Sequence, residues 1–436
     1  MRNLLQTSLQ TIRINLQRTG LALLIAAATL AQSHAQSADR NLAQVSPEDV
    51  GMSSTALAAF NTGMRGEVDK GQLAGIITMI AREGKLVHTD VYGYQDLENK
   101  VPMDEETIFR IFSMTKPIVG VALMTLHEDG KFSLDDPVEK FIPEFANLQV
   151  AKEDGPNGIP VTEPQQHKMT MRELMSHTGG LTYGSFSRSQ VDTLYTQADV
   201  TDRNSTLKDM IAKLAQIPLR QQPGSAWHYS VSVDVQGYLV EVLSGQTLDV
   251  YLQEQLFAPL GMVDTRFYVG SEKAARFSRE YTSSPTGLSS PENGEFIEPA
   301  SFLSGGGGLT STAGDYLRFA QMVANGGELD GVRILKPETV DLMRSSQLPE
   351  GMTEIPGYTG NAFGLDFAVV VDPASNGGMS AGSYWWWGIA GSWFWIDPVE
   401  DLVFVGMIQN RNLRYARQLQ LMSKELVYGA ITESKK

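Results

Sequence analysis

Two residues of the chain have the types and the spacing of a nucleophile and its base. Ser113 and Lys116 lie three positions apart, and the stretch that follows, 117–124, is almost wholly apolar. Residues three apart share one face of a helix. Burial disfavours the charged form of a lysine, and the neutral amine is the base that a serine hydroxyl needs for attack at neutral pH. The pattern predicts covalent catalysis by Ser113, with Lys116 as base or proton relay. Taken alone, it also fits a helix cap followed by a lysine whose ammonium reaches solvent.

The same spacing occurs again at Ser205 and Lys208. This second pair follows Asn204 and opens a segment, 205–214, that is first polar and then apolar, so a helix cap with a solvated lysine explains it. Other catalytic signatures are absent from the sequence: there is no G-x-S-x-G elbow, H-E-x-x-H, Walker loop or G-x-G-x-x-G. The six His are scattered. We therefore expect neither a metal nor a cofactor.

Composition narrows the class of protein further. The chain has 436 residues, of which 42% are hydrophobic and 19% charged, a balance typical of globular proteins. Its formal net charge of −15 argues against a nucleic-acid partner. It has no Cys, which excludes disulfides, thiolate catalysis and cysteine-based metal sites.

The N-terminus has the pattern of a secretory signal peptide. Arg2, Arg13 and Arg18 precede an apolar run over 21–30, and a small-x-small pattern follows at 33–35. The apolar run is too short to cross a bilayer, which takes about 20 residues. We predict a signal peptide over residues 1–35, export to the periplasm or the outside, and no stable membrane span after cleavage.

Hydrophobic periodicity and turn residues indicate strands near both ends of the chain and helices between them. A run of four glycines at 305–308 leads into a helix N-cap signature, and residues 150–168 and 282–300 read as polar loops. We predict one sheet built from both termini with a helical insertion. The expected helices cover 54–70, 113–130, 207–214, 233–243 and 415–426, and the expected strands cover 76–81, 85–92, 362–371, 392–396 and 402–407.

Several short motifs, in this order, resemble the serine β-lactamases, the penicillin-binding proteins and the related family VIII esterases. The resemblance covers roughly residues 45–430, and its strength lies in the ordered set. The motifs are S-M-T-K at 113–116, S-L-D-D-P-V at 133–138, L-M-S-H-T-G-G-L at 174–181, P-G-S-A-W-H-Y-S at 223–230, the glycine run with T-S-T-A-G-D-Y at 305–316, and W-W-W-G-I-A-G-S at 385–392.

The resemblance implies an α/β (α+β) fold of the β-lactamase and transpeptidase type. An antiparallel sheet flanked by helices would be formed by residues 45–115 and 300–436. An all-helical insertion domain would lie within the mainly helical residues 116–299. The active site would lie at the interface of these two domains.

The resemblance also assigns roles within the site. Ser113 would be the nucleophile, Lys116 the base or proton relay, and Tyr229, which matches the tyrosine of the family's Y-x-N motif, the proton donor to the leaving group. The backbone N–H groups of Ser113 and Ile389 would form the oxyanion hole. The family's K-T-G triplet aligns with Trp386, Trp387 and Gly388, which with Val231 would contact the substrate. In the family the turn that contains His177 is structural, so we do not expect His177 to be the base.

Two departures bear on the substrate. Val231 replaces the Asn of Y-x-N and Trp386 replaces the Lys of K-T-G, so an amide and a cation that would hold a β-lactam are missing. These departures favour a carboxylesterase for small neutral esters, with the tryptophans of 385–395 either lining an apolar pocket or packing in the sheet. The alternatives are a β-lactamase, a D,D-peptidase, an amide or oligoamide hydrolase, an acyltransferase, or a non-catalytic penicillin-binding module. The oligomeric state is left open.

Overall fold

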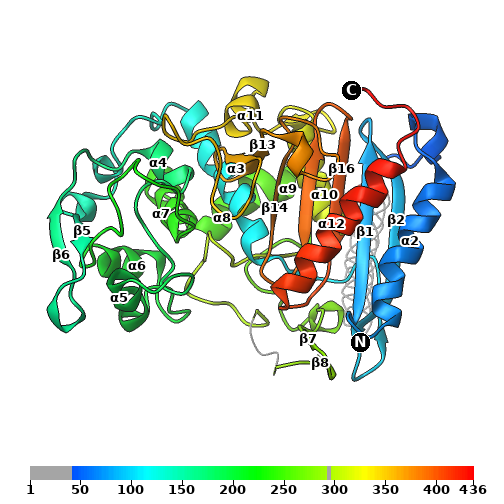
Figure 1. The fold of residues 1–436 in the computed structure, drawn as a ribbon, viewed down its shortest axis with the longest axis horizontal. Helices are drawn as coiled ribbons and strands as arrows, with labels where there is room; N and C mark the ends of the chain where they lie inside the picture. The colour runs from blue at the N-terminus through cyan, green and yellow to red at the C-terminus, as the bar shows by residue number, and fades with distance from the viewer. Residues whose placement is uncertain (1–41, 292–295) are drawn as a thin grey trace, which may run out of the picture. The chain divides into compact units, whose positions relative to one another are not determined.

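The computed structural model, which describes residues 42–291 and 296–436, has an eight-stranded antiparallel sheet at its centre (Figure 1). The predicted signal peptide lies outside the described residues. The order of the strands across the sheet is β12-β13-β14-β15-β16-β1-β2-β3. Their bounds are β1 Gly75–Arg82, β2 Lys85–Asp96, β3 Val101–Pro102, β12 Asn361–Phe363, β13 Ala368–Val370, β14 Tyr384–Trp387, β15 Trp393–Asp397 and β16 Leu402–Met407.

Both ends of the described chain contribute to this sheet. Strand β16, near the C-terminus, pairs antiparallel with β1, with Ile77 opposite Met407, and β1 pairs with β2 around the turn at 83–84. The prediction of one antiparallel sheet built from both termini and flanked by helices is confirmed.

Helices pack on both faces of the sheet. Helices α2 and α12 lie in front of the strands in Figure 1, and α10 lies behind them. Because side chains alternate along a strand, Phe404 and its stacked partner Trp395 face Phe60 of α2, whereas Phe394 contacts Tyr316 of α10. The α-helices are α2 Ser54–Asp69, α3 Thr115–Glu128, α4 Met171–Met175, α5 Gln190–Ala198, α6 Leu207–Leu214, α7 Ser232–Ser244, α8 Leu248–Leu252, α9 Ala258–Leu260, α10 Ala313–Ala324, α11 Pro337–Met343 and α12 Leu413–Gly429.

The segment between the two halves of the sheet is not all helical. The prediction of an all-helical insertion domain within residues 116–299 is therefore wrong. Helices α3 and α7 pack against each other in its interior. The polar loop expected at 150–168 instead contains a hairpin, in which Val150 is buried opposite Glu163 and also bridges Leu219. One buried apolar side chain and backbone pairing thus suffice to order a polar segment. The short strands are β4 Phe109–Arg110, β5 Gln149–Glu153, β6 Val161–Pro164, β7 Thr282–Ser284, β8 Gly287–Ser289, β9 Thr310–Ser311, β10 Glu328–Leu329 and β11 Val332–Arg333.

The strand expected over 362–371 is broken into two. Strands β12 and β13 pair with each other around a turn in which Asp366 has φ 64°, a left-handed conformation that a continuous strand excludes. The turn directs the Asp366 side chain into the interior, where Gln236 of α7 donates a hydrogen bond to it over 3.0 Å. The apolar pattern of this stretch conceals the turn because both strands and the turn are buried.

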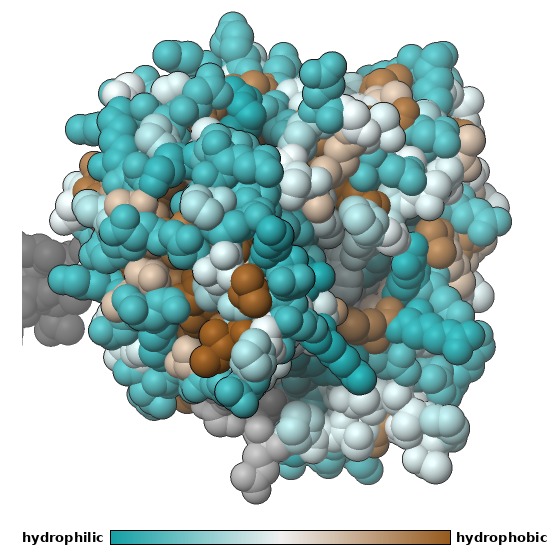
Figure 2. Space-filling model, turned by 60° about the vertical axis from the view of Figure 1, so that its left-hand side comes forward, coloured by the Kyte–Doolittle hydropathy of each residue, from teal (hydrophilic) through white to brown (hydrophobic). Residues whose placement is uncertain are grey.

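The surface seen in Figure 2 is largely hydrophilic, with apolar residues gathered in a few small patches beside a hollow. Within residues 42–291 and 296–436, none of the helices combines the length and the apolar character needed to span a membrane.

Candidate active site

Ser113 lies at the joint between the sheet and helix α3. It belongs to a short 3-10 helix, η2 Phe112–Met114, that runs directly into α3. Phe112 has φ 42°, a strained left-handed conformation of the kind that collects at functional sites. The end of β14 packs on this backbone because residue 388 is a glycine: a Cβ there would lie 2.4 Å from the Ile111 carbonyl oxygen. The close approach brings residue 389 to the cavity that contains Ser113.

Lys116 is fully buried in the first turn of α3. Its Nζ donates a hydrogen bond over 2.6 Å to the carbonyl oxygen of Gly306 and one over 2.8 Å to the hydroxyl of Tyr183. It lies 3.4 Å from Ser113 Oγ. The structure therefore brings the two predicted residues within reach of a proton transfer.

Burial also changes the acidity of Lys116. Loss of solvent lowers the pKa of its ammonium to about 8, and the charges of Asp234 and Asp366 oppose this shift by raising the pKa. A lysine with this pKa is partly neutral close to physiological pH, whereas a solvated lysine is not.

Tyr229 stands on the other side of the serine. Its hydroxyl is hydrogen-bonded to Ser113 and accepts a hydrogen bond over 3.4 Å from Trp386 Nε1. Its ring centroid lies 4.6 Å from Lys116 Nζ. Burial raises the pKa of the phenol well above its usual value, so Tyr229 keeps its proton at neutral pH and can donate it.

Tyr183 is a site residue that the sequence analysis did not single out. It lies between α4 and α5, just after the predicted turn at 174–181, and its hydroxyl accepts a hydrogen bond from Lys116. Its ring lies 5.3 Å from that of Tyr229, and burial raises the pKa of its phenol well above the usual value. The one available signal was a tyrosine next to a recognised motif.

The glycine run has a function that the N-cap signature did not suggest. Gly306 presents its carbonyl oxygen to Lys116, and its N–H donates over 3.0 Å to Asp234. A Cβ at this position would lie 2.4 Å from Asp234 Oδ2 and 2.6 Å from the Tyr183 hydroxyl. Only a glycine fits between these groups.

Two buried acids, Asp234 and Asp366, lie behind the lysine. Asp234, in the first turn of α7, also accepts a hydrogen bond over 2.5 Å from Ser304 Oγ. Burial raises the pKa of both carboxyls, and the Lys116 charge opposes the shift. The sequence marks Asp234 only as an acid within an otherwise apolar helix. It does not mark Asp366, because the turn that contains this residue is not evident from the sequence.

Ser113 opens into a cavity of about 510 Å³. Trp386, Trp387 and Ile389, to which the resemblance assigns substrate contacts and the oxyanion hole, line it. Val231 and Gly388 are buried and are not among the lining residues. Among the described residues of the lining, Arg203 alone carries a positive charge, and its guanidinium packs 4.6 Å over the Phe296 ring. The other lining residues include Phe112, Tyr183, Phe186, Trp227, Tyr229, Phe267, Phe302 and Tyr358.

Four of the five tryptophans of 385–395 divide between the two expected locations, and Trp385 lines a separate cavity. Trp386 and Trp387 face the cavity, and Trp387 Nε1 donates a hydrogen bond over 3.1 Å to the Tyr358 hydroxyl. Trp393 and Trp395 are buried in the sheet.

Neither His177 nor the second serine–lysine pair contacts this cavity in the described part of the chain. His177 is buried against Tyr229, and its Nδ1 shares a hydrogen bond of 3.1 Å with Ser230. Ser205 donates to the carbonyl of Asp202, while Thr206 is the residue that caps α6. Lys208 is exposed on that helix.

Metal ligands do not gather in the part of the chain that the structure describes: no three His, Asp or Glu side chains lie close enough together to hold an ion. The chemistry available to the cavity is that of a hydroxyl nucleophile, a lysine of lowered pKa and two protonated phenols.

Known proteins match most of the chain. The model of the Beta-lactamase family matches residues 60–421. Esterase EstB of Burkholderia gladioli is 32% identical over 364 residues, which cover 77% of this chain and 85% of that protein. Lovastatin esterase of Penicillium rubens is 27% identical over 376 residues, which cover 80% of this chain and 92% of that protein.

Solved structures agree with these relatives. The structure of EstCE1, described as a hydrolase with promiscuous acyltransferase activity, superposes with a TM-score of 0.74 at 26% identity, covering 86% of this chain and 99% of that one. Because the family model covers well over half of the sequence and an esterase that matches 77% of the chain is 32% identical, the chain belongs to the Beta-lactamase family, as an esterase-like hydrolase.

Proposed function

We propose that the protein hydrolyses small neutral carboxylic esters through an acyl-enzyme on Ser113. The observation that carries this proposal is the position of the buried Lys116 Nζ, 3.4 Å from Ser113 Oγ, with a pKa lowered to about 8. The esterases among its relatives support the substrate class.

The acylation step assigns one task to each group. Neutral Lys116 takes the proton of Ser113 Oγ as this oxygen bonds to the ester carbonyl carbon. The electron pair of the carbonyl moves to its oxygen, which the N–H groups of Ser113 and Ile389 hold. When the ester C–O bond breaks, Tyr229 gives its proton to the leaving alkoxide and regains one from Lys116.

Deacylation runs the same relay with water. Lys116, through Tyr229, takes a proton from a water molecule as its oxygen attacks the acyl carbon, and Ser113 Oγ leaves with the returned proton. Tyr183 and Gly306, which accept hydrogen bonds from Lys116, hold the amine in place through both steps.

Acyl transfer is the second candidate. An alcohol in place of water would accept the same acyl group, and EstCE1 is described as combining both activities. β-Lactamase, D,D-peptidase, amide or oligoamide hydrolase and a non-catalytic penicillin-binding module would use the same acylation, but the last would stop at the acyl-enzyme.

Two further proposals concern organisation. The site draws Ser113, Gly306 and Trp386 from the residues assigned to the sheet domain, 45–115 and 300–436, and Tyr183, Tyr229 and Asp234 from the mainly helical 116–299, which supports an active site between two domains. The signal pattern at 1–35 supports export to the periplasm or the outside.

Removal of the nucleophile tests the proposal directly. Ser113→Ala is expected to lower kcat for p-nitrophenyl butyrate by at least about a thousandfold, because no other group forms the acyl-enzyme. Circular dichroism should show an unchanged fold. Ser205→Ala is the matched control and should keep wild-type turnover. Full turnover in Ser113→Ala would remove Ser113 from the mechanism, and a single stoichiometric burst in the wild type would favour the non-catalytic module.

The pH dependence of turnover tests Lys116 as the base. Because only the neutral amine accepts a proton, kcat/KM should rise as pH rises through about 8. Asp234→Asn removes a charge that raises the Lys116 pKa, so the midpoint should move to lower pH. Asp209→Asn, on the exposed cap of α6, should leave the midpoint unchanged. A midpoint that is the same in Asp234→Asn would contradict the coupling between these two residues.

Substrate choice tests the role of the substituted motifs. A β-lactam carboxylate must lose water on entry, and only a paired cation compensates that cost. Trp386 supplies none, and Arg203 is already engaged over Phe296. We expect kcat/KM for p-nitrophenyl acetate or butyrate to exceed that for a chromogenic cephalosporin at least tenfold, about 1.4 kcal/mol. An equal or faster cephalosporin would show that another group binds the carboxylate.

A further inference from the structure

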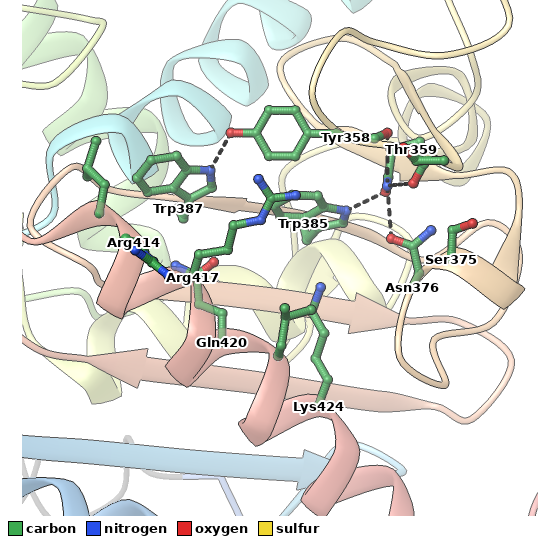
Figure 3. Close-up of a pocket in the computed structure, with 13 residues that line it drawn as sticks. Tyr358, Thr359, Ser375, Asn376, Trp385, Trp387, Arg414, Arg417, Gln420 and Lys424 are labelled. Carbon is green, nitrogen blue, oxygen red and sulfur yellow. Dashed lines mark hydrogen bonds between the residues drawn. The ribbon is translucent and has the colours of Figure 1, made fainter.

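A second cavity, which the proposed reaction does not use, lies between strand β14 and helix α12 (Figure 3). Its volume is about 680 Å³, within the range of small-molecule sites. It shares Tyr358, Trp387 and Leu413 with the catalytic cavity, so the hydrogen-bonded pair Tyr358–Trp387 forms a common wall.

The charged residues that line this second cavity are all positive. Arg414, Arg417 and Lys424 come from α12, and none of the described lining residues is an acid. Their spacing places them along one side of the helix. Figure 3 shows the side chains of Arg417 and Lys424 rising from α12 toward Trp385. A wholly cationic cavity is notable in a chain whose formal net charge is −15.

Lys424 is the buried member of this set. Its side chain is 7% exposed, whereas Arg414 and Arg417 are exposed at the mouth. No described residue forms an ion pair or a hydrogen bond with its ammonium, which lies 4.7 Å over the Trp385 ring. Burial, and then the charge of Arg417, lower its pKa to about 8. Burying a cation is costly unless an anion pairs with it, and no acid among the described residues lines the cavity near Lys424.

A second polar group in the cavity also lacks a partner. Gln420, one turn before Lys424 on α12, is 8% exposed, and its Nε2 is buried without a hydrogen-bond acceptor. An N–H donor and an ammonium that both lack acceptors call for a ligand that accepts hydrogen bonds and carries negative charge.

The rest of the wall defines the remainder of the ligand. Trp385, Trp387, Leu413 and Leu421 provide apolar surface beside the cations. Indole faces and leucines favour an aromatic or alkyl group, which an inorganic ion does not have. Of the three cations only Lys424 is buried, whereas solvent already stabilises the charges of Arg414 and Arg417. A single negative charge is therefore enough to pair the buried ammonium, and a carboxylate provides it.

We propose that this cavity binds a small organic carboxylate, with its carboxylate between Lys424 and Arg417 and its apolar body against Trp385 and Trp387. The carboxylate can belong to a free acid or to a substrate that reaches across the Tyr358–Trp387 wall from the catalytic cavity. Binding to this site does not depend on the proposed esterase activity.

Calorimetry on the Ser113→Ala protein tests the proposal without turnover. The probe is 4-phenylbutyrate, and the uncharged 4-phenylbutyramide is its matched control. We expect the carboxylate to bind at least about tenfold more tightly than the amide. Equal affinity for the two probes would overturn the proposal, and tighter binding of phenyl phosphate would overturn the assignment of a carboxylate.

Three variants locate the binding. Lys424→Met removes the charge at nearly constant volume, so it should abolish the preference for the carboxylate and leave the urea midpoint equal or higher. Arg417→Gln, at an exposed position, should weaken carboxylate binding and provides a test that does not depend on core packing. Lys208→Met changes an exposed lysine on α6 and is the control: it should bind 4-phenylbutyrate as tightly as the Ser113→Ala protein does. Unchanged carboxylate binding in both Lys424→Met and Arg417→Gln would overturn the proposal.

Kinetics with the active protein distinguish the two sources of the carboxylate. The substrates are the mono-p-nitrophenyl ester of adipic acid and neutral p-nitrophenyl hexanoate. A loss of kcat/KM in Lys424→Met that is confined to the charged ester supports a substrate carboxylate. If Lys424→Met leaves the ratio of kcat/KM for the charged ester to kcat/KM for the neutral ester unchanged, while the Ser113→Ala protein binds the carboxylate, the occupant is a free acid.

Discussion

The burial of one ammonium group, that of Lys116, is the constraint on which the rest of the site depends. A lysine without solvent is costly unless its hydrogen bonds are satisfied and opposite charge is near. Here the Gly306 carbonyl and the Tyr183 hydroxyl accept its hydrogen bonds, and Asp234 and Asp366 provide the opposite charge. These contacts do not fully offset the cost of burying the charge, because the pKa of Lys116 is still lowered to about 8. The lowered pKa makes the neutral amine available as a base.

The fold supplies these partners from distant parts of the chain. The short pairing of β4 with β9 fixes the backbone just before Ser113 against the backbone just after the glycine run. Packing of α3 on α7 places Asp234 behind Lys116, and the turn between β12 and β13 adds Asp366. The last residues of β14 complete the cavity because Gly388 permits close approach to Ile111. A change in any of these contacts would act on the lysine.

Local spacing did not by itself distinguish Ser113 and Lys116 from Ser205 and Lys208; the apolar stretch after Lys116 and the ordered resemblance did. The role expected for Tyr229 rested on the resemblance alone. One sheet built from both termini was predictable because its strands are apolar and lie near both ends of the chain, whereas its antiparallel order was implied by the resemblance. Tyr183, Gly306 and Asp366 were not predictable, since their roles arise from tertiary contacts across 67, 190 and 130 positions that no local pattern encodes. The hairpin at 149–164 was missed for the same reason: its pairing and its contact with Leu219 outweigh a polar, glycine- and proline-containing sequence.

The most direct test of the account is to find the acyl group. The protein is mixed with p-nitrophenyl butyrate, quenched in acid within the first turnover, digested and analysed by mass spectrometry. The account predicts one butyryl group on the peptide that contains Ser113, formed as fast as p-nitrophenol is released and absent from Ser113→Ala. Release of p-nitrophenol with Ser113 unmodified throughout, or with the butyryl group on another residue, would contradict it.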